Sequence, residues 1–348
     1  MNKDSFKQTG WLDVRYQSAM ERVKLLDTVA SLGIPVNYPN YSSLRYSPQD
    51  TNLFRVDIKN NKLDYIGQPS IAGAMASSGV RFYSVEEFCR IAELDFQVVP
   101  RIPFFHVPHD GRIFPPELME SVCIPEQKFM EFHEKMRDKE IYKIIPDVQR
   151  TRSHIERFEV SRLLCDVERF IGPKEPMEKY GMGFCYEKAY DGSFIKEVTP
   201  VLLEKTKIYY DRHHSRMNSV AKKHPHLLLF DVHSYSDEIV PKDYLIERQV
   251  TPDVCIGTDP NYTPAPLIEI LEKHLLRENV SFAVNYPYAG CFIPNAVLEK
   301  KHYIDFAGVM IEVNKRYYCD RNGDVIKGRL LQLKNTLEKV LIDCIGAV

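Results

Sequence analysis

An apolar run that ends abruptly in polar side chains is the strongest chemical signal in this sequence. Residues 227–236 read Leu-Leu-Leu-Phe-Asp-Val-His-Ser-Tyr-Ser, so a buried strand would lead into Asp231, His233 and Ser234. Ligands of α/β sheets bind beyond the carboxyl ends of the strands, because a rigid strand aims its side chains into the crevice there. A histidine two residues after an aspartate suits a metal ligand with a carboxylate close by. A hydrogen-bonded core histidine is the alternative.

Two further segments have the same build. Residues 102–107 form a short apolar run that is followed by His109 and Asp110. Residues 308–316 are also mostly apolar, and they carry a single acidic side chain, Glu312. A buried glutamate is costly unless it is paired or functional. Two histidines and a glutamate at three strand ends match a hydrolytic zinc site, which needs an open water position and a carboxylate base.

Two arginines lie between the first and second histidine segments. Arg162 is near the start of an apolar stretch and Arg169 is just past its end. The planar guanidinium group is suited to binding a carboxylate through two hydrogen bonds. Alternatively, both arginines merely pair with Asp166 and Glu168 as surface charges.

Other polar positions are less distinctive. His213 and His214 lie in a helical stretch, where adjacent side chains point about 100° apart, so at most one is expected in a shared site and surface positions are the simpler interpretation. Residues 285–290, which begin with Asn285, follow a strand and resemble a loop that lines a pocket. Glycine spacing typical of a phosphate-binding loop does not occur, which disfavours a nucleotide enzyme.

From about residue 99 the apolar pattern alternates between strands and helices. We expect strands at 102–107, 160–167, 181–187, 226–233, 252–257, 279–285 and 307–313. We expect helices at 126–143, 200–222, 263–277 and 327–344. Alternation of this kind predicts an α/β domain over residues 99–348, with a central mixed sheet flanked by helices.

Residues 1–98 have a different pattern and no cluster of catalytic residue types. Residues 13–32 show helical periodicity. Residues 53–58 and 63–66 read as two strands of a hairpin, and residues 84–87 as a capping box that opens a helix. We expect a small α+β appendage whose role the sequence does not indicate.

The composition is that of an ordinary soluble protein, with 348 residues, 44% apolar and 27% charged. A net charge of −2 gives no general attraction to nucleic acid or to an anionic membrane. The polar N-terminus lacks the apolar core of a secretory signal, and no apolar run approaches membrane-spanning length. Eight cysteines are scattered without a Cys-x-x-Cys pair. We therefore expect a cytoplasmic protein with free thiols.

These motifs, in this order, resemble the N-formylglutamate amidohydrolase family and, more distantly, the zinc carboxypeptidases. Each motif alone is weak, but the ordered series across roughly residues 102–320 is quite specific. The residues that carry the resemblance are His109-Asp110-Gly111, Pro115, Ser161-Arg162, Asp166-Val167-Glu168-Arg169, Met177, Gly181-Met182-Gly183, His214, Asp231-Val232-His233-Ser234, Gly257-Thr258, Asn285-Tyr286-Pro287-Tyr288-Ala289-Gly290 and Glu312-Val313-Asn314.

The resemblance implies a phosphorylase/hydrolase-like α/β fold and a zinc site with roles for particular residues. His109 and His233 match the metal-binding histidines, and Glu312 matches the catalytic carboxylate. Arg162 and Arg169 match the arginines that polarise the scissile carbonyl or hold a substrate carboxylate.

Further positions follow from the same resemblance. His214 matches a polar or acid–base histidine, which with Asn285 we assign to substrate binding. Asp138 is the best positional candidate for a third, acidic metal ligand, because Asp110 is awkwardly close to His109. His106 is spaced to act as a ligand or as a partner of one.

Two positions depart from the family pattern. Asp110 stands where the family has serine, and Glu168 stands where it has asparagine. A glutamate in a pocket for an anionic substrate would repel that substrate, so a glutamate-like substrate is in doubt.

We therefore expect a zinc-dependent amidohydrolase acting on an N-acylated amino acid such as N-formylglutamate. The alternatives are a zinc peptidase or deacylase acting on other N-acyl or peptide substrates, and a catalytically silent binding protein.

Overall fold

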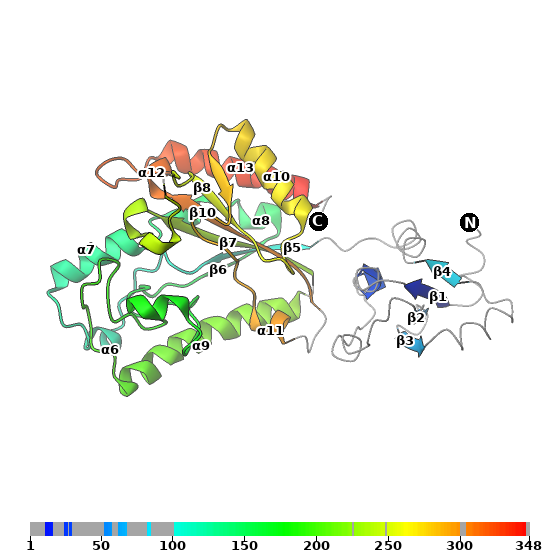
Figure 1. The fold of residues 1–348 in the computed structure, drawn as a ribbon, viewed down its shortest axis with the longest axis horizontal. Coiled ribbons are helices and arrows are strands. Elements are labelled where there is room, and N and C mark those ends of the chain that lie inside the picture. Colours follow the sequence, from blue (N-terminus) through cyan, green and yellow to red (C-terminus); the bar gives the residue numbers. More distant parts are fainter. Residues whose placement is uncertain are drawn as a thin grey trace. The chain divides into compact units, whose positions relative to one another are not determined.

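The protein is described here from a computed structural model, which divides into two compact units. It describes residues 101–345 except 225, 248 and 300–303, and in the first hundred residues four strands and the helical residues 24–26, 28 and 29. One unit comprises Met1–Pro100 with His224–His226 and Ala296–Asp305, and the other comprises the rest (Figure 1). The domain boundary expected at residue 98 stays a prediction.

The first unit contains a four-stranded sheet in the order β3-β2-β1-β4. Its strands are β1 (Trp11–Tyr16), β2 (Asn52–Asp57), β3 (Lys62–Gly67) and β4 (Phe82–Ser84). The expected hairpin is confirmed, because β2 and β3 pair antiparallel. The helix expected from residue 13 is wrong at its start, because residues 13–16 pair along β2 and such tertiary pairing overrides local periodicity. The capping box expected at 84–87 runs beyond the described residues.

The second unit is built around a six-stranded mixed sheet in the order β6-β5-β7-β10-β8-β9, as expected. β5 pairs parallel with β6 and β7, and β8 pairs parallel with β9 but antiparallel with β10. The strands are β5 (Ile102–Val107), β6 (His154–Arg157), β7 (His226–Tyr235), β8 (Val254–Gly257), β9 (Phe282–Val284) and β10 (Asp305–Asn314).

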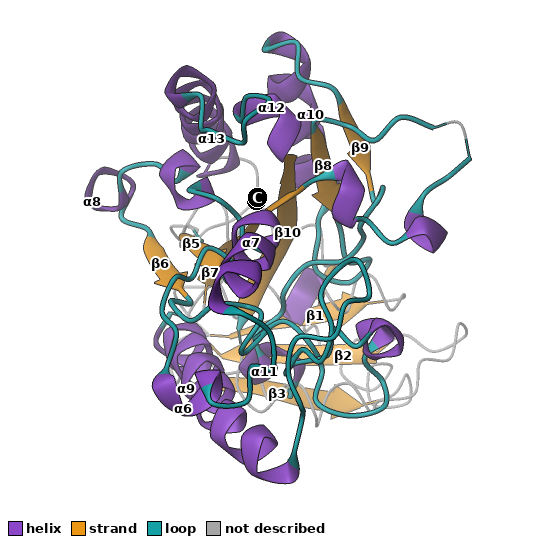
Figure 2. Ribbon diagram, turned by 90° about the vertical axis from the view of Figure 1, so that its left-hand side faces the viewer, coloured by secondary structure: helices purple, strands orange, loops and turns teal. Residues whose placement is uncertain are grey.

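Helices cover both faces of this sheet. Figure 1 shows α10 and α13 on one side and α9 on the other, and Figure 2 shows the same division around β10. The α-helices are α6 (Pro116–Met119), α7 (Glu126–Met136), α8 (Val148–Thr151), α9 (Pro200–Lys223), α10 (Ala265–Arg277), α11 (Asn295–Leu298), α12 (Lys315–Tyr318) and α13 (Lys327–Ile345). None of the described helices combines the length and the apolarity needed to cross a bilayer.

Three expected elements differ from the structure. Residues 160–167 and 181–187 are turns rather than strands, and β6 at His154–Arg157 takes the edge position instead. The helix expected at 126–143 ends at Met136, because Arg137 is extended and Glu140 adopts a left-handed backbone conformation with φ of 57°. Residues 137–140 therefore form a loop, and Asp138 is on that loop.

Apolar residues of the strands are buried against α10 and α13 on one face of the sheet. Phe105 of β5 and Phe230 of β7 are fully buried, and their rings stack with centroids 5.3 Å apart. We predict that Phe105→Ala lowers the free energy of unfolding by about 3–5 kcal/mol, because it removes buried area and leaves a cavity. Urea denaturation measures this. Ile342→Ala, at a side chain that is 65% exposed, should change the unfolding free energy by no more than about 0.5 kcal/mol.

Candidate active site

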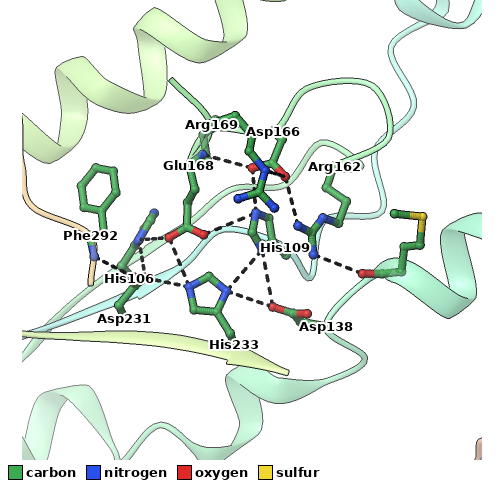
Figure 3. Close-up of polar contacts among 12 residues, drawn as sticks. His106, His109, Asp138, Arg162, Asp166, Glu168, Arg169, Asp231, His233 and Phe292 are labelled. Atoms are coloured by element: carbon green, nitrogen blue, oxygen red, sulfur yellow. Dashed lines mark hydrogen bonds and ion pairs between the residues drawn. The ribbon is translucent and has the colours of Figure 1, made fainter. Parts of the chain in front are cut away.

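The predicted histidine and carboxylate residues come together at the ends of β5 and β7 (Figure 3). His109 lies just beyond β5, and Asp231 and His233 lie in the last part of β7. His106 is directly opposite Asp231 in the parallel register of these two strands. The cluster therefore depends on two neighbouring strands that end at the same edge of the sheet, as expected for a ligand site in an α/β fold.

Both histidines have one ring nitrogen held by a carboxylate. His109 Nε2 is 2.8 Å from Asp166 Oδ1, and His233 Nε2 is 3.0 Å from Asp231 Oδ1. Because an ionised carboxylate only accepts, each Nε2 carries the hydrogen, and each Nδ1 is left free to bind a cation when the ring is neutral. The two Nδ1 atoms face each other at 3.2 Å. Carboxylate–histidine pairs of this kind are typical of metal sites.

Asp138 completes a three-sided cluster with these two nitrogens. Its Oδ2 lies 3.8 Å from Nδ1 of His109 and 3.4 Å from Nδ1 of His233. With the 3.2 Å between the two nitrogens, a point inside this triangle lies about 2 Å from all three atoms, which is a zinc–nitrogen or zinc–oxygen bond length. Asp138 is fully buried, and its Oδ2 accepts no hydrogen bond from the described residues. A divalent cation fits this position.

A second set of ligand atoms lies on the other side of the imidazole rings. Glu168 Oε1 is 3.1 Å from His233 Nε2, and Glu168 Oε2 is 3.6 Å from His109 Nε2. His109, Glu168 and His233 therefore also meet the distance requirements of a metal site, as do His106, Glu168 and Asp231. A cation bound to the Nε2 atoms would have to displace the hydrogen bond from His109 to Asp166 and the ion pair between His233 and Asp231. We therefore favour the side that Asp138 faces.

The loop that carries Asp138 is braced from both sides. The backbone N–H of Asp138 donates to the carbonyl of His109, at 2.9 Å. Asp110 Oδ1 accepts from Arg137 Nη1 at 2.9 Å and from the Glu140 backbone N–H at 3.1 Å. The hydrogen bonds of Asp110 thus fix Arg137 and Glu140, which lie on either side of Asp138 in the loop.

The two arginines gather around one buried carboxylate. Arg162 Nη2 lies 3.1 Å from Asp166 Oδ2, and Arg169 Nε lies 3.6 Å from the same oxygen. The Tyr186 hydroxyl donates to this oxygen at 2.7 Å. Both arginines thus pair with Asp166, as the second interpretation of the sequence expected, but in the interior and not on the surface. The Nε atoms of both arginines are buried and make no hydrogen bond within the described residues.

Glu312 lies on β10, paired with Cys255 of β8. Its side chain is buried, and burial raises the pKa of its carboxyl to about 8. His233 and Arg162 act against this rise in pKa, whereas the negative charges of Asp138 and Glu168 add to it. These four charges belong to the cluster just described, so Glu312 is close enough to the site for its pKa to depend on them. A carboxylate with a raised pKa is suited to accept and return a proton.

The adjacent histidines of α9 differ from the surface pair expected. His213 is fully buried, with Nε2 2.9 Å from Nε2 of His106. His214 donates through Nε2 to the Val167 carbonyl at 2.8 Å, next to Glu168. The expectation of surface positions is wrong because the His213 ring packs against His106 and Phe158, and the His214 ring contacts Val167 of the 161–169 turns. The role of His214 in substrate binding stays a prediction.

Asn285 makes no hydrogen bond or ion pair with the described residues of this cluster. Its side chain accepts a hydrogen bond from the backbone N–H of Thr258 and donates one to the hydroxyl of Thr258, both at 2.8 Å. It ties the loop after β9 to the loop after β8. Its predicted contact with substrate remains untested.

Three groups in the cluster were not assigned a site role from the sequence. Asp166 was considered only as a charge partner, Tyr186 was not considered, and Phe292 donates its backbone N–H to Asp231 Oδ2 at 2.9 Å. The Asp-x-Glu-Arg spacing around Asp166 is the one signal that pointed to this turn. The backbone N–H of Phe292 could not be predicted as a donor, because nearly every residue type has a backbone N–H.

Comparisons with known proteins find a matching family and similar solved structures. The family model of N-formylglutamate amidohydrolase matches residues 103–319. The crystal structure of N-formylglutamate amidohydrolase from Ralstonia eutropha JMP134 is 14% identical, with a TM-score of 0.57 over 71% of this chain and 94% of that one. A gene product of Agrobacterium tumefaciens is 12% identical, with a TM-score of 0.46 over 71% of this chain and 91% of that one.

No curated protein matches the sequence. The solved structure from Ralstonia eutropha supports the α/β fold, whereas the family model covers well over half of the chain. The chain therefore belongs to the N-formylglutamate amidohydrolase family.

Proposed function

We propose that this protein is a zinc-dependent amidohydrolase that cleaves the amide bond of an N-acylated amino acid. The observation that carries the proposal is the triangle of His109 Nδ1, His233 Nδ1 and the buried Asp138 Oδ2. Family membership supplies the reaction class, hydrolysis of a carbon–nitrogen amide bond.

His109, His233 and Asp138 would hold the metal in this proposal. Bound zinc supplies Lewis acidity, which lowers the pKa of a water molecule and polarises a carbonyl group. Asp166 and Asp231 keep the two imidazoles oriented through their Nε2 atoms. Zinc is favoured by the nitrogen-rich donor set, and iron and manganese are the other metals that such a set accepts.

Glu312 would take the proton of the attacking water on its carboxylate and deliver it to the leaving nitrogen. Arg162 would stabilise the negative charge that develops on the carbonyl oxygen. Arg169 would hold the carboxylate of the substrate, because its Nε–H makes no hydrogen bond within the described residues although it lies 3.6 Å from Asp166. Glu312 and Arg162 are buried and Arg169 is partly buried, which strengthens these charge interactions by excluding water.

Glu168 supports a second candidate substrate class. Its carboxylate is the most exposed of those in the cluster and is adjacent in sequence to Arg169. A negative charge there disfavours a substrate with an acidic side chain. A deacylase or peptidase acting on neutral or basic N-acyl substrates is therefore the alternative to N-formylglutamate hydrolysis, and a silent binding protein is the outcome if nothing is cleaved.

The direct test is a panel of N-formyl, N-acetyl and dipeptide substrates, with acidic, neutral and basic side chains, given to the zinc-loaded protein. We expect amide hydrolysis of at least one N-acyl amino acid, with release of its free amine. A zinc-loaded protein that cleaves no member of the panel would support the binding-protein alternative.

We predict that Arg169→Met lowers kcat/KM by at least about 30-fold on the best substrate of this panel, mainly through KM. Removing one partner of a buried charge pair costs about 2–5 kcal/mol. Arg212→Met on the exposed face of α9 is the matched control and should leave kcat/KM unchanged. Equal kinetics for both variants would remove Arg169 from the substrate-binding role.

A further inference from the structure

A row of buried polar contacts continues from His233 away from the proposed metal position. Asp231 Oδ1 lies 3.0 Å from His233 Nε2 and 2.9 Å from His106 Nδ1. His106 Nε2 in turn lies 2.9 Å from His213 Nε2. His106 and His213 are both fully buried, and Asp231 is nearly so. The row therefore joins β7, β5 and α9 through side chains alone.

The chemistry of the groups sets the direction of these hydrogen bonds. Asp231 can only accept, so His106 carries a hydrogen on Nδ1 and donates it. A neutral His106 then has a lone pair on Nε2, and His213 must donate from its own Nε2. The Nδ1 of His213 faces Glu156 Oε1 at 3.5 Å, at the edge strand β6. The Asp231 carboxylate therefore sets the tautomer of His106, whereas Nδ1 of His213 makes no hydrogen bond within the described residues.

Packing gives His106 little freedom to adopt another arrangement. Its ring centroid lies 4.5 Å from that of Phe292 and 5.1 Å from that of His213. The backbone N–H of Phe292 donates to Asp231 Oδ2, so the segment that packs on His106 also holds the second carboxylate oxygen. Asp231 is thus fixed from three sides, by His106, Phe292 and His233.

We propose that His106 is a positioning residue for the metal site. Supported by His213, it holds Asp231 as a fixed acceptor for the Nε2–H of His233, so that His233 presents a bare Nδ1 beside Asp138. His106 does not touch the metal or the substrate in this role. The role rests on the proposed zinc site, and partners of metal-ligating histidines typically change metal affinity by about 10–100-fold.

Substitutions can separate the hydrogen bond from the bulk of the ring. His106→Asn keeps a side-chain N–H near the place of Nδ1, whereas His106→Phe keeps a ring without a donor. His213→Gln keeps a donor near the place of Nε2, whereas His213→Met removes it. His274→Phe is the matched control, because His274 is also a buried histidine paired with an aspartate, Asp343, on helices α10 and α13.

The experiment measures the zinc dissociation constant of each variant by competition with a chelator, beside its unfolding midpoint in urea. We expect His106→Phe to weaken zinc binding about 10-fold or more, His106→Asn to restore most of that loss, and His274→Phe to leave zinc affinity unchanged. His213→Met should weaken binding several-fold and His213→Gln less. Loss of affinity without rescue by asparagine would show a packing effect and overturn the proposal.

Two other results would also overturn it. Unchanged zinc affinity in His106→Phe, with the wild type binding one zinc, removes the positioning role and leaves the proposed function intact. Two zinc ions in the wild type and one in His106→Phe would make His106 a ligand, together with Glu168 and Asp231. Absence of zinc from the wild type would instead contradict the proposed function itself.

Discussion

Glu312→Gln is expected to lower kcat by about 10²- to 10⁴-fold, the usual contribution of a general base, while zinc stays bound. Glutamine has nearly the shape of glutamate but cannot take a proton from water. Glu312 is on β10 within the charge field of His233, Asp138, Glu168 and Arg162, and burial raises the pKa of its carboxyl to about 8. Steady-state kinetics on the best substrate gives kcat, and elemental analysis of the same preparation gives the zinc content.

Retained zinc is the internal control for this variant, because a lost metal would lower kcat for another reason. A Glu312→Gln protein that keeps both its zinc and most of its turnover would show that another group moves the proton. Glu168 would then be the next candidate, since it is the other glutamate that contacts the histidines.

Asp138→Asn is expected to weaken zinc binding by more than about 100-fold, the upper range for groups that only support a ligand. The reason is its buried Oδ2, which lies within 3.8 Å of both Nδ1 atoms and accepts no hydrogen bond from the described residues. Glu168→Gln is the matched control, because Glu168 contacts the same histidines at their Nε2 atoms. Its zinc affinity should change far less. Competition with a chelator measures both dissociation constants.

The opposite order of effects would identify the Nε2 side of the rings as the metal position. A large loss in Glu168→Gln with little change in Asp138→Asn would require the contacts of the two histidines with Asp166 and Asp231 to open when metal binds. The two variants therefore distinguish the two sets of ligand atoms that the structure offers.

The central sheet and its main helices were predictable from the sequence because their apolar runs are long and bounded by polar turns. Residues 226–233 and 307–313 are confirmed as strands, and 200–222 and 327–344 as helices, each within a few residues of the structure. Residues 160–167 and 181–187 are apolar too, but they pack as turns in a second core cluster beside α9. Hydrophobicity alone does not distinguish a buried turn from a buried strand.

The sequence predicted those site residues whose side-chain type by itself suggests a chemical role. His109, His233, Asp138 and the two arginines do lie together, and Asp138 is available because the helix before it ends at Met136. Contacts between side chains that are far apart in the sequence were not predictable. The contact between His106 and His213 joins residues 107 positions apart, and only the packing of α9 against the sheet creates it.

The measurement that tests the zinc site most directly is elemental analysis of the purified protein beside its His233→Ala variant. We predict about one zinc per chain in the wild type and none in the variant, because His233 is shared by both sets of candidate ligands around the imidazoles. A wild-type protein without metal, even after zinc is added, would contradict a zinc-dependent hydrolase and leave a binding protein with the fold of an amidohydrolase.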